Sequence, residues 1–344
     1  MYRLNDKLIN LTPYNPVSGN YGIRLDANES FIVPPADIME KINAAVSEVQ
    51  LNRYPDPYAK KLCEAFADFH GLDPDLLTAG NGSDELISII VNSFLQKGDK
   101  VLAFTPDFSM YSFYAELAEN MVVTVQKNND LTVDVDKAIN IADTEKIGLI
   151  IFSNPCNPTS LGLKKSEVLK LVKSVSALVV LDEAYMDFWD ESLLSEAPLH
   201  DNLIVLRTCS KAFGSAAIRL GFAYSNEVLN NAIRAAKSPY NVNSLTQEAG
   251  RVILEHKEFL KNANAEIMAS RDALYRELSG ISGLTVYPTV TNFVMIKTDN
   301  AKEIYETLLK NDIVVRHLGD FLRITSGTKE ENKALLKVMR ERNG

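Results

Sequence analysis

Lys211 is the side chain in this sequence with the clearest chemical potential. It comes shortly after the apolar run 203–206, which predicts a buried strand. An ammonium group at the end of a buried strand loses water, so burial favours the neutral amine, which is a nucleophile toward aldehydes. The hydroxyls of Thr208 and Ser210 and the guanidinium of Arg219 add groups that bind phosphate. An aldehyde-binding lysine beside an anion site is what pyridoxal 5′-phosphate (PLP) requires.

Two upstream segments could meet the other needs of that cofactor. The apolar run 178–181 ends in Asp182, and the run 147–152 leads into a polar segment that contains Asn157. PLP withdraws electrons while its ring nitrogen stays protonated, and a carboxylate held under the ring favours that charged form. Asp182 is the candidate for this partner. The Asn157 amide and the Tyr185 hydroxyl are the candidates for contact with the phenolic oxygen of the ring.

Residues 80–85 precede an apolar stretch at 86–95 that is predicted to be helical. Free N–H groups at the start of a helix bind phosphate, helped by the helix dipole. Taken alone, Ser83 is better explained as the N-cap of its own helix. Beside the lysine motif, Ser83 and Asp84 are expected to hold the cofactor phosphate through their backbone amides. Arg219 offers the same phosphate a planar fork of donors, although it could also be a surface arginine.

The order of these motifs resembles that of the fold-type I PLP-dependent aminotransferases, and within them most closely the histidinol-phosphate aminotransferases. The resemblance covers nearly the whole chain. It rests on Asn157-Pro158-Thr159, Asp182-Glu183-Ala184-Tyr185 and Ser210-Lys211-Ala212-Phe213-Gly214 followed by Arg219, and on the segments 11–14, 27–29, 53–56, 79–85 and 322–325 together with Arg316.

The resemblance implies roles for individual residues. It assigns catalysis to Lys211, Asp182 and Tyr185. It implies that the cofactor is bound by Ser83, Asp84, Phe108, Asn157, Asp182, Tyr185, Thr208, Ser210, Lys211 and Arg219, and by Tyr54 from the neighbouring subunit. A shared active site of this kind implies an obligatory homodimer. For the substrate it implies Arg323 and, as weaker candidates, Tyr14, Arg316 and Asn241.

Two of these positions have competing explanations. Phe108 stands where the resemblance implies the ring that stacks on the cofactor, a place usually held by tyrosine; a core aromatic explains the local pattern nearly as well. Phenylalanine keeps the stacking contribution of about 0.5–1.5 kcal/mol and lacks one hydrogen bond. Arg323 lies in an alternating strand and could face solvent. The resemblance implies instead that it clamps a carboxylate or phosphate with paired donors.

The strands and helices predicted around these residues indicate an α/β fold. Apolar strands alternate with helical stretches between residues 99 and 226, which predicts a mostly parallel sheet with ligands bound beyond the carboxyl ends of its strands. The strands are expected at 100–105, 121–125, 147–152, 178–182, 203–207 and 220–224, with helices at 109–118 and 164–175.

A smaller α+β domain is expected after a long helical region at 246–278. Its expected strands are 285–287, 293–297, 313–317 and 321–325, and its helices are 301–310 and 329–340. Thr328 and Glu331 form a capping-box signature before the last helix. The resemblance adds the N-terminal segment to this domain. The expected division is a large PLP-binding domain at 39–254 and a small domain at 1–38 and 255–344.

Composition narrows the class of partner. A net charge of −9 argues against a nucleic acid or an anionic membrane. The cysteines Cys63, Cys156 and Cys209 are few and widely spaced, which favours a reducing compartment. The four histidines show no metal-ligand spacing, and we see no signal peptide or membrane-spanning run. The sequence therefore predicts a cytoplasmic enzyme with small-molecule substrates and no metal.

The activity implied by the resemblance is ping-pong transamination between histidinol phosphate and 2-oxoglutarate, in histidine biosynthesis. An aromatic amino-acid aminotransferase or a threonine-phosphate decarboxylase would share the same frame. Two other classes are disfavoured. A cofactor-dependent regulator would need a DNA-binding segment, and a nucleotide-binding dehydrogenase would need a Gly-x-Gly-x-x-Gly after an early strand.

Overall fold

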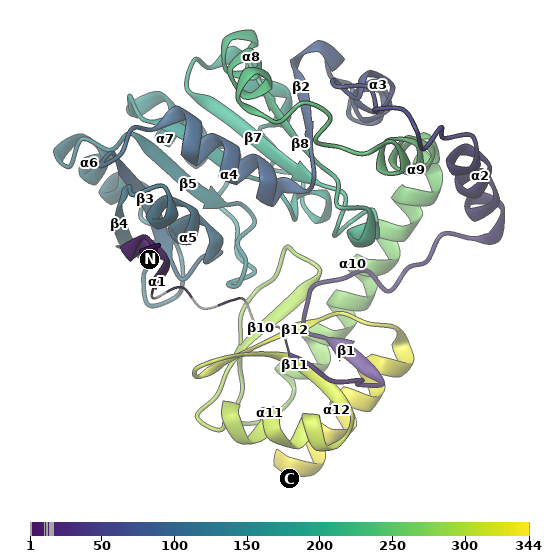
Figure 1. The fold of residues 1–344 in the computed structure, drawn as a ribbon. Coiled ribbons are helices and arrows are strands. Elements are labelled where there is room, and N and C mark those ends of the chain that lie inside the picture. Colours follow the sequence, from purple (N-terminus) through teal and green to yellow (C-terminus); the bar gives the residue numbers. More distant parts are fainter. Residues whose placement is uncertain (1, 10, 12, 14–16, 344) are drawn as a thin grey trace.

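The computed structural model describes residues 2–9, 11, 13 and 17–343 and contains two sheets in two lobes joined by a long helix (Figure 1). The larger sheet has seven strands in the order β2-β8-β7-β6-β5-β3-β4. These strands are β2 (Leu77–Gly80), β3 (Lys100–Thr105), β4 (Met121–Gln126), β5 (Leu149–Ser153), β6 (Leu178–Asp182), β7 (Leu203–Thr208) and β8 (Gly221–Ser225).

The neighbours from β4 to β7 pair in parallel, whereas β8 runs antiparallel to both β7 and β2. Parallel strands are covered on both faces and read as continuous apolar runs. β5 and β6 show this most clearly, since nearly all of their residues are buried. The predicted α/β fold with a mostly parallel sheet is confirmed.

Helices cover both faces of this sheet, and successive strand residues enter different cores. Ile151 packs in the core that includes α4 and α5, and Ile150 packs in the opposite core that includes α3, α6 and α7. This alternation follows from the two-residue period of a strand. The helices of the large lobe are α2 (Ala36–Ser47), α3 (Lys60–His70), α4 (Ser83–Phe94), α5 (Met110–Leu117), α6 (Val135–Thr144), α7 (Lys165–Ser174), α8 (Glu227–Ala236) and α9 (Ser244–Glu255).

Short pieces complete the lobe. They are the N-terminal helix α1 (Asp6–Ile9) and the 3₁₀ turns η1 (Pro74–Leu76), η2 (Met186–Phe188), η3 (Leu194–Leu199) and η4 (Ala216–Ile218). Among the residues that the structure describes, no helix is both long enough and apolar enough to cross a bilayer.

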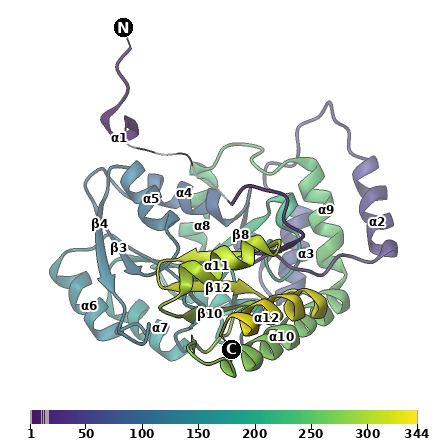
Figure 2. The ribbon, with the colours of Figure 1, turned by 90° about the horizontal axis from the view of Figure 1, so that it is seen from below.

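The smaller lobe is built on a five-stranded sheet in the order β1-β11-β12-β10-β9. Its elements are β1 (Ile23–Leu25), β9 (Thr285–Val286), β10 (Phe293–Lys297), β11 (Ile313–Leu318), β12 (Phe321–Thr325), α10 (Lys257–Ser279), α11 (Ala301–Lys310) and α12 (Lys329–Asn343). The N-terminal strand β1 pairs in parallel with β11. Seen from below, α11 and α12 lie in front of this sheet, and α10 runs alongside it (Figure 2).

Most expected elements lie within two residues of the observed ones, and the capping box is present: Thr328 N donates to Glu331 and Glu331 N donates to Thr328 Oγ1. The strands β1 and β2 were not predicted, and the sequence analysis named no helix at α2, α3, α6 or α8. The helical region 246–278 is divided at His256, whose ψ of 59° is not helical. The domain boundaries at residues 39 and 254 stay predictions.

Candidate active site

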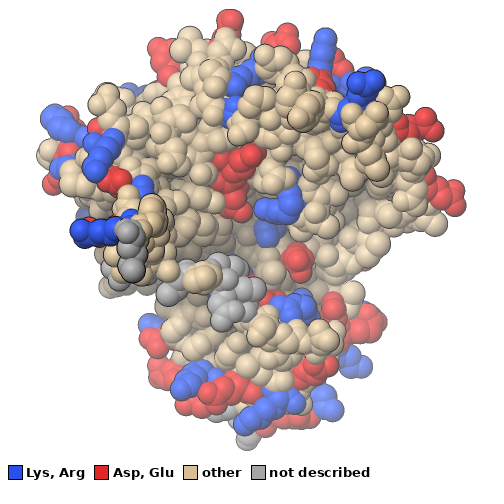
Figure 3. All heavy atoms as spheres, in the orientation of Figure 1, with Lys and Arg blue, Asp and Glu red and all other residues tan. Residues whose placement is uncertain are grey.

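The carboxyl ends of the central strands bring the predicted residues to one edge of the sheet. Ser153 at the end of β5 is in register with Asp182 at the end of β6, and β7 pairs with β6 on the other side. The loops that carry Asn157 and Lys211 leave from the same edge. On the surface, the molecule is hollowed between the two lobes, with basic side chains visible in the hollow (Figure 3).

Lys211 lies where its ammonium is poorly solvated and partly surrounded by positive charge. Burial, together with the charges of Arg323 and Arg219, lowers the pKa of Lys211 to about 8, against the opposing effect of Glu29 and Asp84. Its Nζ donates a 2.8 Å hydrogen bond to the carbonyl of Ala27. With this pKa about a tenth of the lysine is neutral at pH 7, several hundred times more than for a lysine with the ordinary pKa of 10.5.

Asp182 is buried at the end of β6. Burial raises its pKa to about 7, although a hydrogen bond from Tyr111 opposes the rise. That bond runs from the Tyr111 hydroxyl to Oδ2 over 2.8 Å, and the Ala184 amide donates to Oδ1 over 3.1 Å. A buried carboxylate with these two neutral donors would be further stabilised by a cation.

Tyr185 follows Asp182 and is also buried. Burial raises the pKa of Tyr185 to about 12, although Arg323 and Asn28 act in the opposite direction. The Asn28 side-chain amide donates a 2.8 Å hydrogen bond to the Tyr185 hydroxyl. The phenol is therefore neutral and keeps its own proton available for donation.

The residues expected to bind the cofactor phosphate lie around the start of α4. Gly82 is the N-cap, and the helix begins without a side-chain cap, so the hydroxyl of Ser83 does not cap its own helix. Arg219 lies beside this terminus, with Nη1 at 3.3 Å from Ser210 Oγ and Nη2 at 3.5 Å from the Asp84 carboxylate. Thr208 Oγ1 donates a 3.1 Å hydrogen bond to Ser210 Oγ and so orients the Ser210 hydroxyl.

Two glycines make this arrangement possible. A Cβ atom on Gly82, whose φ is +84°, would stand 2.8 Å from Arg219 Nη2. A Cβ atom on Gly221 would stand 2.5 Å from the Ser83 backbone nitrogen. Backbone and guanidinium therefore approach each other closely because these two positions have no side chain.

Phe108 precedes α5 and is partly buried. Its ring meets the ring of Tyr111 edge to face, with centroids 5.5 Å apart. Since Tyr111 also bonds Asp182, Phe108 lies one side chain away from the carboxylate. This position is compatible with a ring above the same site.

Arg323 is buried on β12 of the small sheet and does not face solvent. Its Nη1 donates to Asn157 Oδ1 and its Nη2 donates to the Asp26 carbonyl. The guanidinium carbon also lies 5.4 Å from the centre of the Phe293 ring. Arg323 thus joins the small lobe to the loop after β5.

Residues 26–28 were not predicted to contact so much of the site. Three successive residues contact three predicted site residues: the Asp26 carbonyl accepts from Arg323, the Ala27 carbonyl accepts from Lys211, and the Asn28 amide donates to Tyr185. Asn28 has a positive φ of 54°, which asparagine tolerates better than most residues. The resemblance at 27–29 was the only signal in the sequence, and it gave no role.

The weaker candidates lie in different places. Arg316 is the cross-strand neighbour of Arg323, and Tyr14 lies outside the described residues. Asn241 donates to the Ala79 carbonyl and to Glu85, in the large lobe. Tyr54 is 81% exposed and stacks on Tyr240 with ring centroids 4.6 Å apart.

The donor set fits PLP. A helix terminus, a hydroxyl and a guanidinium converge on an anion site, and a lysine with a lowered pKa lies close enough to be influenced by that guanidinium. A buried carboxylate with a raised pKa gains most from a cationic partner such as a protonated ring nitrogen. These groups lie next to the ends of β2, β6, β7 and β8, which pair with their neighbours at one edge of one sheet.

Comparison with known proteins agrees with this geometry. A sequence model of the family "Aminotransferase class I and II" matches residues 21–339. The chain is 43% identical to the histidinol-phosphate aminotransferase of Clostridium novyi (96% of this chain, 94% of that protein) and 38% identical to that of Pyrococcus furiosus (98% and 97%). The solved histidinol-phosphate aminotransferase of Sinorhizobium meliloti, in complex with PLP, shares the fold with a TM-score of 0.90 at 24% identity, covering 99% of both chains.

Proposed function

The chain belongs to the class I and II aminotransferase family, and from that premise we propose that it exchanges an amino group between L-histidinol phosphate and 2-oxoglutarate. The products are imidazole acetol phosphate and glutamate, a step of histidine biosynthesis, and the cofactor is PLP. Curated relatives at 35–43% identity over nearly the whole chain carry the histidinol-phosphate aminotransferase name. The alternatives, an aromatic amino-acid aminotransferase and a threonine-phosphate decarboxylase, are not favoured.

The observation that carries the proposal is the position of Lys211 between two arginines from different lobes. Arg219 donates to Ser210 beside Lys211, and Arg323 donates to the Asp26 carbonyl, next to the Ala27 carbonyl that accepts from Lys211. Burial and both of these charges lower the pKa of Lys211. Arg219, with Ser210 and the start of α4, would hold the cofactor phosphate. Arg323 would bind an anionic group of the substrate.

Bound PLP supplies an aldehyde for amines and a ring that withdraws electrons from the substrate carbon. Asp182 would keep the ring nitrogen protonated, and Tyr185 and Asn157 would contact the phenolic oxygen. Phe108 would cover the ring face. Thr208 would orient Ser210.

Lys211 is the proposed acid–base residue. With substrate and cofactor bound, its amine would take a proton from the reacting substrate carbon, and this requires the amine to be neutral at the start. A pKa of about 8 places the group close to the working pH, where a positioned acid–base group contributes roughly 10²–10⁴-fold.

Arg323 suits two substrates of different shape. Histidinol phosphate offers a phosphate and 2-oxoglutarate offers a carboxylate, and a guanidinium fork binds either in a bidentate manner. Its present partners, Asn157 and the Asp26 carbonyl, leave the fork preorganised. Tyr14, Arg316 and Asn241 stay weaker candidates for the far end of the substrate.

We further propose a homodimer with a shared active site in the cytoplasm. The exposed ring of Tyr54 would reach the cofactor phosphate of the partner subunit. Exposed apolar side chains close to it in sequence, Leu51 and Tyr58, support an interface on this part of the chain. The three cysteines are unpaired, which supports a reducing compartment.

The test is an absorption titration of the PLP-loaded protein. Histidinol phosphate should bleach the yellow cofactor band, and 2-oxoglutarate should restore it. Phenylalanine and threonine phosphate are the matched comparison substrates. A protein that reacts with either of these and leaves histidinol phosphate unchanged would contradict the proposal.

A further inference from the structure

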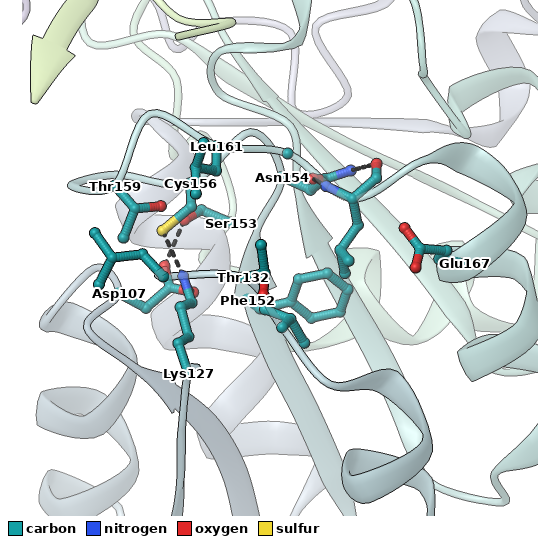
Figure 4. A pocket seen from close by; sticks show the side chains of 14 residues that line it. Asp107, Lys127, Thr132, Phe152, Ser153, Asn154, Cys156, Thr159, Leu161 and Glu167 are labelled. Atoms are coloured by element: carbon teal, nitrogen blue, oxygen red, sulfur yellow. Dashed lines mark hydrogen bonds and ion pairs between the residues drawn. The ribbon is translucent and has the colours of Figure 1, made fainter. Parts of the chain in front are cut away.

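A second reactive cluster lies beside the candidate site, at the carboxyl ends of β3, β4 and β5. Asp107, Lys127, Cys156 and Thr159 line one cavity of about 290 Å³ (Figure 4). Water takes up about 30 Å³ in the liquid, so the cavity has room for several small molecules. The sequence analysis gave none of these four side chains a chemical role. Two of them are chain neighbours of residues that it did assign: Asp107 precedes Phe108, and Cys156 precedes Asn157.

The closest contact in this cluster joins nitrogen to sulfur. Lys127 Nζ lies 2.8 Å from Cys156 Sγ, and both side chains are buried. That separation is typical of N–H···O bonds and is short for sulfur, which is a larger atom. The amine and the thiol are thus held together in one orientation.

The ion pair of Lys127 does not require this contact. Lys127 Nζ lies 3.7 Å from Asp107 Oδ2, and each side chain is only 2% exposed. A carboxylate compensates the buried ammonium, whereas a thiol is a weak acceptor that adds little. The approach of sulfur to nitrogen therefore calls for an explanation other than charge.

We propose that Lys127 and Cys156 form a covalent N–O–S cross-link on exposure to hydrogen peroxide. At 2.8 Å the two atoms are too far apart for a direct bond, but one oxygen atom can bridge them with little movement. This proposal does not depend on the proposed aminotransferase activity.

The chemistry balances with two molecules of peroxide. The first peroxide transfers one oxygen to the thiolate, which becomes a sulfenic acid by a two-electron oxidation, and the other peroxide oxygen leaves as water after protonation. The second peroxide oxidises the amine to a hydroxylamine by two electrons and also releases water. The hydroxylamine oxygen then attacks the sulfenic sulfur, an S–O bond forms, the S–OH bond breaks, and a third water leaves. In total, thiol, amine and two peroxides give the bridge and three waters.

Asp107 can accept the protons that the Cys156 thiol and the Lys127 ammonium must lose before they react. Its Oδ1 accepts from Ser153 and from the Phe108 amide, and its Oδ2 faces Lys127. Burial raises the pKa of Asp107, so the carboxylate accepts a proton more readily than an exposed aspartate. Burial also raises the pKa of Cys156. Burial is the largest influence on Lys127 and lowers its pKa, but Asp107 and Cys156 together outweigh it, so the pKa of Lys127 is raised. Cross-linking should therefore accelerate as pH rises, since both reacting groups must lose a proton.

The bridge would also restrain the loop of the candidate site. Ser153 Oγ donates a hydrogen bond to Asp107 and accepts one from the backbone N–H of Asn157 over 3.1 Å. Hydrogen bonds therefore already connect the loop after β5 to this cluster. A cross-link from Cys156 to Lys127 adds a covalent tie one residue before Asn157. We expect the thermal midpoint to rise by a few degrees and to fall back after reduction.

Peptide mapping of the intact, PLP-loaded protein tests the proposal. After peroxide treatment at mildly alkaline pH, the peptides of Lys127 and Cys156 should appear as one species, heavier than their sum by one oxygen less two hydrogens. Trypsin should no longer cut after Lys127. Excess dithiothreitol should restore both separate peptides, because two dithiols supply the four electrons required.

Cys156→Ser and Lys127→Arg should each abolish the linked species, and Cys63→Ser, which removes another buried thiol, should leave its yield unchanged. Separate peptides in which Cys156 carries only added oxygen atoms would overturn the proposal. So would unchanged peptides after treatment that oxidises exposed methionines. The wild-type map alone decides the matter if a variant fails to fold.

Discussion

The phenolic hydroxyl of Tyr111 donates a 2.8 Å hydrogen bond to Oδ2 of Asp182, the carboxylate proposed to face the cofactor nitrogen. Both side chains are buried, and this bond lowers the pKa that burial raises. Tyr111 therefore helps to keep Asp182 ionised without contacting the cofactor in the proposed arrangement. It is a positioning residue supplied by α5.

Tyr111→Phe should weaken PLP binding. A hydrogen bond to a charged group contributes about 1.5–3 kcal/mol, so we expect a 10- to 100-fold higher dissociation constant. Absorbance titration of the cofactor-free protein measures it. Tyr275→Phe, which removes a hydroxyl in the small lobe, is the control and should bind PLP normally. Equal affinities of the two variants would exclude the role of Tyr111.

Asp182 should make the cofactor-free protein less stable as pH rises. Its pKa is raised from 3.8 to about 7, so between these values the folded state binds more protons than the unfolded chain. Stability from this group is present below that window and is lost as pH rises through about 7. Asparagine mimics the protonated acid and does not titrate, so in urea unfolding across this range wild type should become steadily less stable relative to Asp182→Asn as pH rises. A difference that does not change with pH would contradict the raised pKa.

Lys211 should react with aldehydes according to its lowered pKa. Below about 8, the fraction of neutral amine increases about tenfold per pH unit, and above that value it levels off. The rate of PLP attachment to the cofactor-free protein, followed by absorbance, should have the same shape. Lys211→Ala should show no attachment. A rate that keeps rising to the ordinary lysine value of 10.5 would show that burial and the two arginines do not act as described.

Arg323→Ala should impair substrate binding more than cofactor binding. The change removes two directed donors, each contributing about 1.5–3 kcal/mol with a charged partner, so kcat/KM for histidinol phosphate should fall at least 100-fold. Arg323→Lys keeps the charge and loses the fork of donors, so its kcat/KM should lie between those of wild type and Arg323→Ala. Arg340→Ala removes an exposed partner of Glu277 and is the control. A fall no larger than that of the control would place the substrate anion elsewhere.

The sequence predicted strands best where the apolar runs are long and bounded by polar residues. β3, β6 and β10 have the expected limits because each carries such a run. β12 also has the expected limits, although Arg323 interrupts its apolar residues. β2 was missed because its four residues, Leu77–Gly80, are too few to show a period, and its place depends on antiparallel pairing with β8, far along the chain.

Site residues were predicted where a motif marks a strand end, and missed where only packing reveals them. Asp182, Lys211 and Arg323 stood out as charges beside apolar runs. Tyr111 looks like any apolar helix residue, and only its distance to Asp182 shows its role. The contacts of residues 26–28 come from pairing of β1 with β11, which no local pattern encodes.

Tyr54 provides the test of the shared active site, because mixed dimers separate the two subunits' contributions. If Tyr54 acts on the partner's cofactor, a dimer of Lys211→Ala and Tyr54→Ala has one site with both residues intact. Refolding an equal mixture should then restore activity that each variant lacks alone. Lys211→Ala with Arg219→Ala is the control: Arg219 lies beside Ser210 of its own chain, so each site keeps one lesion. No activity in the first mixture would place Tyr54 in its own subunit's site. Activity in the control would show that Arg219 serves the partner's site, and complementation by Tyr54 would then not be specific.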